Sequence, residues 1–276
     1  MEQQTIDRAE MKSSADPSKE EGCYVYCVIG NSEQGKFAYP AIGGRADEVY
    51  SISYQDIAAV VSASPVKKYP ISRENTITHQ KILEGLMNDF TVLPVKFSTV
   101  ASSRNGSCAA ERIREEVLKV RYEELENLLL KMDGKTELGL KAFWVDMKAI
   151  FQEIVDENIE IKKLRQRLIS KPATQPFGEK ASLGEMVKDA LERKKAKEEK
   201  DILNALKKAC ADRRSNKVFG DEMITNSSFL VEKSKVGQFD GLVDELATTY
   251  DGRMKFKYVG PIAPINFVEL VIVLEG

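Results

Sequence analysis

The stretch TVLPVKFSTV, from Thr91 to Val100, has the apolar residues of a buried strand but carries a proline near its middle. Pro94 has no backbone N–H and cannot donate a hydrogen bond to a neighbouring strand. The small polar residues Ser98 and Thr99 follow directly. We therefore predict a strand over 91–100 in which Pro94 lies at a sheet edge or at a bulge.

Strands and helices are also predicted on both sides of this stretch. A helix over 72–89 precedes it, with Ser72 as the expected N-cap. Residues 107–132 give the clearest helical pattern after it, because their apolar positions step by four and three along one face. Those positions are Leu118, Tyr122, Leu125, Leu129 and Met132, and the earlier strands are expected over 23–30, 49–54 and 57–64.

The second half of the chain is predicted to run β–α–α–β–α–β–β. A strand passes through Trp144, and a helix over 147–169 follows it. A loop with two prolines over 171–180 is expected to break that helix. Ser182 with Glu185 has the form of a capping box at the start of a second helix that ends near Arg213. The remaining elements are a strand over 227–233, a helix over 236–250, a strand over 253–260, a loop over 260–267 and a closing strand over 268–276.

These patterns predict an α+β fold of two domains, each a mostly antiparallel sheet with helices packed on it. The expected divisions are a disordered leader over 1–21, an N-terminal domain over 22–134 and a C-terminal domain over 135–276. The leader is acidic and polar and lacks the apolar segment of a secretion signal.

The charge balance argues against a polyanionic partner. The chain has 41 basic and 43 acidic residues, a formal net charge of −2 and 42% hydrophobic residues. We therefore expect neither nucleic acid nor a membrane as partner. No apolar run approaches the roughly 20 residues that span a bilayer. With no export signal, a cytoplasmic, reducing compartment is expected, in which Cys23 and Cys27 are buried thiols rather than a disulfide or a zinc site.

Motifs for catalysis are scarce. His79 is the only histidine, which excludes most histidine-based triads and metal sites. The sequence contains no phosphate-binding glycine loop, no dinucleotide fingerprint and no nucleophile elbow. We expect no cofactor, no metal and no catalytic residues. The alternative is an enzyme of unrecognised class that uses His79 with a carboxylate, and replacement of His79 by alanine would then abolish activity.

Four segments, in order, resemble the gas vesicle protein GvpF/GvpL family. The segment 79–100 resembles a helix-then-strand block of the family that ends close to TVLPxRFGTV, and 257–270 resembles its closing GPWPPYNFV motif. Ser98 stands where the family usually has glycine. Ile262, Ala263 and Ile265 stand where it prefers Trp, Pro and Tyr. The segments are YVYCVIG at 24–30, HQKILEGLMNDFTVLPVKFSTV at 79–100, ELGLKAFWVD at 137–146 and 229–270.

The resemblance implies a non-enzymatic structural or accessory protein of gas vesicles, hollow organelles with a protein wall. Its expected partners are the small hydrophobic shell protein and other gas vesicle accessory proteins, and its expected location is the cytoplasm and the gas vesicle. The resemblance also implies a modified ferredoxin-like C-terminal domain.

The resemblance suggests two accounts of the edge at Pro94. In one, an apolar edge strand pairs with another chain. In the other, a helix or loop of the same chain covers the edge. Replacing Val95 with Asp distinguishes them, because lost solubility indicates core and lost partner binding with intact folding indicates an interface. The candidate partner-binding residues are Val92, Pro94, Val95, Phe97, Pro261 and Phe267.

Overall fold

The structure, a computed structural model, describes residues 21–30, 35–170 and 177–272. The predicted leader over 1–21 lies outside the described residues except for Glu21, which begins the first strand. The chain forms two compact units, one from Met1–Lys131 with Val268–Gly276 and the other from Met132–Phe267. The predicted division kept 268–276 in the second domain, whereas the structure groups this tail with the first unit.

The first unit is built on a sheet whose centre is β1 (Glu21–Gly30). β1 pairs antiparallel with β4 on one side and with β5 and β6 on the other, and the strand order is β2-β3-β4-β1-β5. Tyr24 to Ile29 are completely buried, as expected for a central strand that is covered on both faces. The other strands are β2 (Lys36–Phe37), β3 (Val49–Tyr54), β4 (Ile57–Pro65), β5 (Val92–Pro94) and β6 (Val100–Ala101).

Helix α1 (Arg73–Leu86) begins as the sequence predicted. The Ser72 side chain accepts a hydrogen bond from the Asn75 N–H at 3.2 Å, which confirms the N-cap. The helix predicted over 107–132 forms in three parts, with a π-helical stretch at its centre. The parts are α2 (Ala109–Arg112), η3 (Ile113–Leu118) and α3 (Tyr122–Met132).

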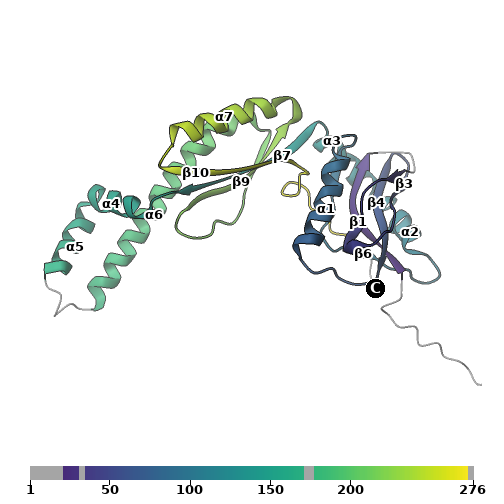
Figure 1. Ribbon diagram of the computed structural model, residues 1–276, viewed down its shortest axis with the longest axis horizontal. Coiled ribbons are helices and arrows are strands. Elements are labelled where there is room, and N and C mark those ends of the chain that lie inside the picture. Colours follow the sequence, from purple (N-terminus) through teal and green to yellow (C-terminus); the bar gives the residue numbers. More distant parts are fainter. Residues whose placement is uncertain (1–20, 31–34, 171–176, 273–276) are drawn as a thin grey trace, which may run out of the picture. The chain divides into compact units, whose positions relative to one another are not determined.

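The second unit is a four-stranded antiparallel sheet in the order β10-β7-β9-β8; two of its helices pack on one face of the sheet, and the other two pack beyond the sheet against the longer of these (Figure 1). With the helices from α4 (Met147–Glu157) to α6 (Phe177–Leu206) counted as one crossover, its elements run β–α–β–β–α–β, the element order of ferredoxin-like domains. The strands are β7 (Lys135–Trp144), β8 (Asp212–Ser215), β9 (Met223–Glu232) and β10 (Met254–Ile262). The helices are α4 (Met147–Glu157), α5 (Ile159–Ser170), α6 (Phe177–Leu206) and α7 (Val236–Thr249).

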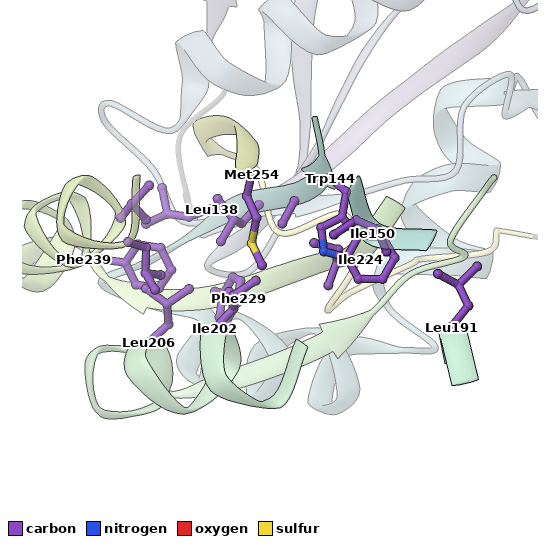
Figure 2. Packing of buried hydrophobic residues seen from close by; sticks show 14 of the residues in the cluster. Leu138, Trp144, Ile150, Leu191, Ile202, Leu206, Ile224, Phe229, Phe239 and Met254 are labelled. Carbon is purple, nitrogen blue, oxygen red and sulfur yellow. The ribbon is translucent and has the colours of Figure 1, made fainter. Parts of the chain in front are cut away.

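Alternate residues of β7 supply the core of this unit. Leu138, Leu140 and Trp144 all point to the helical face and are at most 3% exposed. Phe229 of β9 packs against Phe239 of α7 with ring centroids 5.1 Å apart. Figure 2 shows Leu138, Trp144, Phe229 and Phe239 in the cluster between the sheet and the helices. Because side chains alternate between the two faces of a strand, the β7 residues between these core positions point to the opposite face of the sheet.

Two predicted helix boundaries were wrong. Helix α6 already begins at Phe177, so Ser182 and Glu185 lie within the helix and form no cap; its Leu183 and Met186 pack against the core cluster. The helix expected over 147–169 is broken at Asn158, whose backbone is extended and whose side-chain amide donates to the Ile154 carbonyl at 2.7 Å. Tertiary packing and a local side-chain bond override the periodic pattern at these positions.

Two predicted strands are also shorter than expected. β5 ends at Pro94, and Ser98 adopts a left-handed backbone with φ of 67°, which turns the chain before β6. In the tail, where a strand was predicted over 268–276, the described residues contain one isolated bridge, between Leu270 and Val95. The rest of that prediction, 273–276, lies outside the described residues.

Candidate functional site

His79 lies in a buried aromatic cluster of the first unit. It projects from α1, is 8% exposed and packs beside Tyr24, Tyr26 and Phe97, with ring centroids 5.6 to 5.8 Å away. The Tyr24 hydroxyl lies 3.0 Å from His79 Nδ1. That hydroxyl also accepts a hydrogen bond from the Ser98 N–H at 3.0 Å. Because Nδ1 is the one acceptor among the described hydrogen-bond partners of this hydroxyl, we infer that Tyr24 donates its proton to Nδ1, which leaves the imidazole proton on Nε2.

Burial lowers the pKa of His79 to about 4, because the surrounding rings provide little solvation for a charged imidazolium. Burial also raises the pKa of Tyr24. Both side chains are therefore neutral near pH 7. The alternative prediction paired His79 with a carboxylate, but the hydrogen-bonding side chain in the structure is a tyrosine. The cluster joins α1, β1 and the turn at Ser98, and its observed contacts are those of a packed core.

The edge of β5 is covered by the C-terminal tail. The Val95 N–H donates to the Tyr26 carbonyl of β1 at 3.0 Å. Backbone groups of adjacent strand residues point to opposite sides, so the carbonyl of Pro94 points away from β1. On that side the Leu270 N–H donates to the Pro94 carbonyl at 3.3 Å, and the Lys96 N–H donates to the Leu270 carbonyl at 3.1 Å. A proline fits here because the tail pairs with its carbonyl and needs no N–H from it.

The six candidate partner-binding residues divide between the two units. Val92, Pro94 and Val95 are buried in the first unit, and Phe97 is half-buried beside His79. Pro261 is exposed and Phe267 half-buried in the second unit. Pairing of a partner strand with the edge at Pro94 and Val95 requires displacement of the tail at Leu270.

The closing segment 260–267 is attached to β7 by a buried carboxylate. Glu137 is 1% exposed, and its carboxylate accepts hydrogen bonds from the backbone N–H of Asn266 at 2.9 Å and from the Asn266 side-chain amide. The Thr136 hydroxyl donates to the Ile262 carbonyl at 3.0 Å. Burial raises the pKa of Glu137, although the bonds from Asn266 oppose the shift. Sequence reasoning missed this contact; its signal was a charged residue within an apolar strand.

We expect Gly260→Ala to lower the free energy of unfolding of the second unit by about 2 kcal/mol, because the backbone conformation at this position disfavours side chains. Gly260 has φ of 131°, and a Cβ there would lie 2.9 Å from the Glu137 carbonyl oxygen. Urea unfolding followed by Trp144 fluorescence measures the change. Gly241→Ala is the matched control, since nothing lies within 4 Å of its Cβ in helix α7. That control should be neutral or stabilising, and an unchanged midpoint for Gly260→Ala would contradict the expectation.

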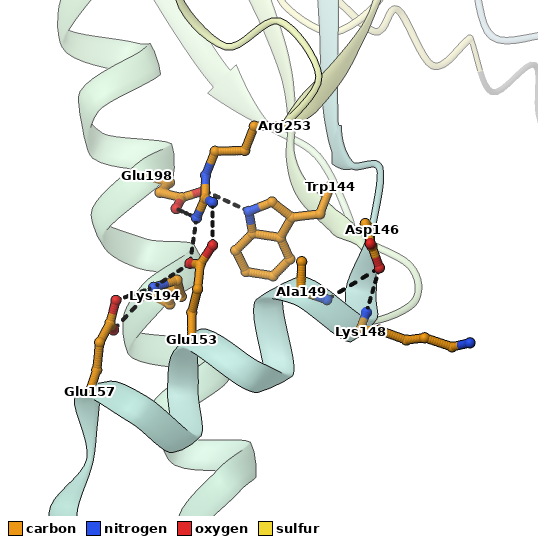
Figure 3. A network of polar contacts seen from close by, with 9 residues as sticks. All are labelled: Trp144, Asp146, Lys148, Ala149, Glu153, Glu157, Lys194, Glu198 and Arg253. Atoms are coloured by element: carbon orange, nitrogen blue, oxygen red, sulfur yellow. Dashed lines mark hydrogen bonds and ion pairs between the residues drawn. The ribbon is translucent and has the colours of Figure 1, made fainter.

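An ion-pair network connects α4, α6 and the start of β10 (Figure 3). The Arg253 guanidinium donates to both oxygens of Glu153, at 2.7 and 3.0 Å, and to Glu198 at 2.6 Å. The Trp144 indole N–H donates to the other oxygen of Glu198 at 2.6 Å, and Lys194 pairs with Glu153 at 2.9 Å. Hydrogen bonding to Arg253 lowers the pKa of Glu153 to about 2. The Glu153 carboxylate is held ionised, which suits a structural clamp rather than proton transfer.

We expect Arg253→Lys to destabilise the second unit by about 1 kcal/mol, because an ammonium cannot reproduce the bidentate contact with Glu153. The emission maximum of Trp144, the chain's single tryptophan, should also shift as its contact with Glu198 rearranges. Denaturant unfolding and fluorescence spectra measure both effects. Arg193→Lys, on the exposed surface of α6, is the control and should change neither quantity. Equal behaviour of the two variants would show that the network contributes little.

No metal-binding cluster is evident in the part of the chain that the structure describes: no group of three His, Cys, Asp or Glu side chains there could hold an ion. Cys23 and Cys27 are buried free thiols, and burial raises the pKa of both. In the same residues no helix has the length and apolarity needed to cross a bilayer.

Comparison with known proteins places this two-unit fold among proteins of gas vesicle formation. The model of the family described as "Gas vesicle synthesis protein GvpL/GvpF" matches residues 22–269, and the chain belongs to that family. The match covers both compact units and includes all six candidate partner-binding residues.

Relatives and solved structures support the assignment. The chain is 25% identical over 224 residues to gas vesicle protein F of a Nostoc species, covering 80% of this chain and 88% of the relative. It is 27% identical to gas vesicle protein F of a Streptomyces species, covering 89% of this chain and 99% of the relative. The crystal structure of GvpF from Anabaena superposes with a TM-score of 0.78 at 24% identity, over 91% of this chain and all of that one, which shows the same fold.

Proposed function

We propose that this protein is an accessory factor of gas vesicle assembly that binds the small hydrophobic shell protein and acts without catalysis. The observation that carries the proposal is the family match over 22–269, which includes both units. Its partners are the shell protein and other gas vesicle accessory proteins. Its place of action is the cytoplasm and the gas vesicle.

The physical need for such a factor follows from the nature of a gas-excluding wall. A subunit that builds a wall with a very apolar face exposes that face to water until it is incorporated, and exposed apolar patches aggregate. A partner that covers the face keeps the subunit soluble. Of the six candidate contact residues, Phe97, Pro261 and Phe267 retain exposed surface and are the ones available for this role without rearrangement.

Co-expression of the tagged protein with its shell protein in a reducing cytosol tests the proposal. We expect the two to co-purify at moderate salt and the soluble fraction of the shell protein to increase. The control is the tagged protein expressed alone, which must be folded and monodisperse. A folded protein that leaves the shell protein insoluble and purifies without it, even when the other accessory proteins are co-expressed, would contradict the proposal.

A further inference from the structure

The face of the second sheet that lies away from its helices carries three exposed lysines. Lys141 projects from the central strand β7, and Lys255 and Lys257 project from its neighbour β10. The register places Lys257 directly opposite Lys141 and Lys255 opposite Phe143. Directly opposed residues of antiparallel strands point to the same face, so the three ammonium groups share one surface.

The opposed lysine pair is unfavourable for the isolated protein, since like charges directly across two strands repel. Within the described residues, no carboxylate forms an ion pair with Lys141 or Lys257. The Lys257 ammonium lies 5.2 Å from the centre of the Phe143 ring, which confirms that it lies on this face. The nearby Glu137 carboxylate is directed to Asn266 and does not neutralise the pair.

A groove of about 320 Å³ lies beside the two lysines, at the lower end of the ~300–1,000 Å³ typical of ligand sites. Its floor is Gly139, where an added Cβ would lie 2.9 Å from Val259 Cγ2. The walls are Lys141, Lys257, Val259 and polar residues of β9 and of the closing segment, among them Asn226, Ser228 and Asn266. The volume suits a few side chains of a short segment rather than a large cofactor.

We propose that this face binds an acidic, extended peptide segment of a protein partner, whose carboxylates pair with Lys141 and Lys257 at the groove. Charge complementarity identifies the chemistry of the partner segment, since the ammonium pair needs anions. Lysines on an edge strand also discourage edge-to-edge pairing. That role accounts for Lys255 and Lys257 of β10, but not for Lys141, which lies on an interior strand and lines the groove.

Fluorescence anisotropy tests the inference with the full chain. The probe is a short fluorescein-labelled peptide of alternating Glu and Ser, and a peptide of alternating Lys and Ser is the reference. We expect the acidic peptide to bind at low salt and the basic one not to bind. The double variant Lys141→Gln, Lys257→Gln should weaken binding at least about tenfold, because both ion pairs are lost. The matched control, Lys197→Gln with Lys200→Gln on exposed positions of α6, should bind like the unmodified protein.

Three results would overturn the inference. The acidic peptide does not bind, or the double variant binds it as tightly as the unmodified protein does. In the third, the α6 control loses as much affinity as the double variant, which would indicate attraction by overall charge. If inorganic phosphate or a single-stranded oligonucleotide bound more tightly than the acidic peptide through the same two lysines, the ligand of this face would be that anion and not a peptide. The inference is independent of the proposed function, because the probe is synthetic and no shell protein is present.

Discussion

Val95→Asp is expected to unfold the first unit. The side chain is 2% exposed, between β1 and the tail residue Leu270, which is also 2% exposed. The substitution removes apolar contacts and places a carboxylate at a buried position. We expect a loss of more than about 4 kcal/mol, a large part of the ~5–15 kcal/mol stability of an ordinary domain. The measurements are soluble yield and amide hydrogen exchange of β1, in which protection should be lost.

The adjacent residue provides a matched control for this experiment. Lys96 is exposed, and its contact with Leu270 uses the backbone N–H, so Lys96→Asp introduces the same carboxylate without burying it. This control should fold with unchanged protection. If Val95→Asp also folds normally but no longer co-purifies with the shell protein, the residue belongs to an interface and the tail is displaced on binding.

The strand at Pro94 shows what the sequence could predict and what it could not. The absence of a proline N–H correctly placed Pro94 at a sheet edge, because that consequence is local. Leu270, which covers the edge, lies more than a hundred residues away in the sequence, so no local sequence pattern predicts this contact. The sequence was compatible with an edge that pairs with another chain and with an edge that the same chain covers. The structure shows the tail of the same chain on this edge.

Local signals were reliable where one hydrogen bond or one strand decides the structure. Ser72 was predicted as an N-cap and is one, and the strand predicted over 49–54 is β3, Val49–Tyr54. The signals failed where tertiary packing decides, as at Ser182, which has the sequence of a cap but lies inside α6. The Glu153–Arg253 network joins residues 100 positions apart, so its members had no recognisable spacing.

The candidate contact residues show the same limit. Apolar residues of 91–100 are attractive as a docking strand only if their exposure is assumed, and exposure is a property of the folded chain. Lys141 and Lys257 were overlooked for the opposite reason. They are unremarkable in the sequence, and only the register of β7 and β10 places the two charges face to face.

The stability of the first unit is expected to fall as the pH is lowered from 7 to 5, through His79. The pKa of His79 is about 4 in the folded protein and near the ordinary 6.5 in the unfolded chain. Between these values the unfolded state binds a proton that the folded state does not, so acid favours unfolding. The contribution is fully present above pH 6.5, decreases by about 2 kcal/mol between pH 7 and 5 and by about 3 kcal/mol when the pH reaches 4.

This pH window is diagnostic because His79 is the only histidine of the chain. In the first unit, the ion-paired Glu115, Glu116 and Glu124 have lowered pKa values and lose their contributions only at more acidic pH, as does Glu153 of the second unit. Glu137 has a raised pKa, so its protonation on acidification stabilises the folded second unit and acts in the opposite direction. The loss of stability near pH 5 to 6.5 in the first unit is therefore assigned to one imidazole.

Hydrogen exchange of β1 amides across this range measures the loss, and NMR of the single imidazole reports its pKa and its proton on Nε2. His79→Asn is the matched variant, because its amide can accept the Tyr24 hydroxyl bond but does not titrate. We expect this variant to be less stable at pH 7, since the smaller side chain leaves a cavity, and to show no slope between pH 6.5 and 5. An imidazole that titrates near 6.5 in the folded protein, or an equal slope in the variant, would mean that His79 is hydrated and that the cluster with Tyr24 opens readily.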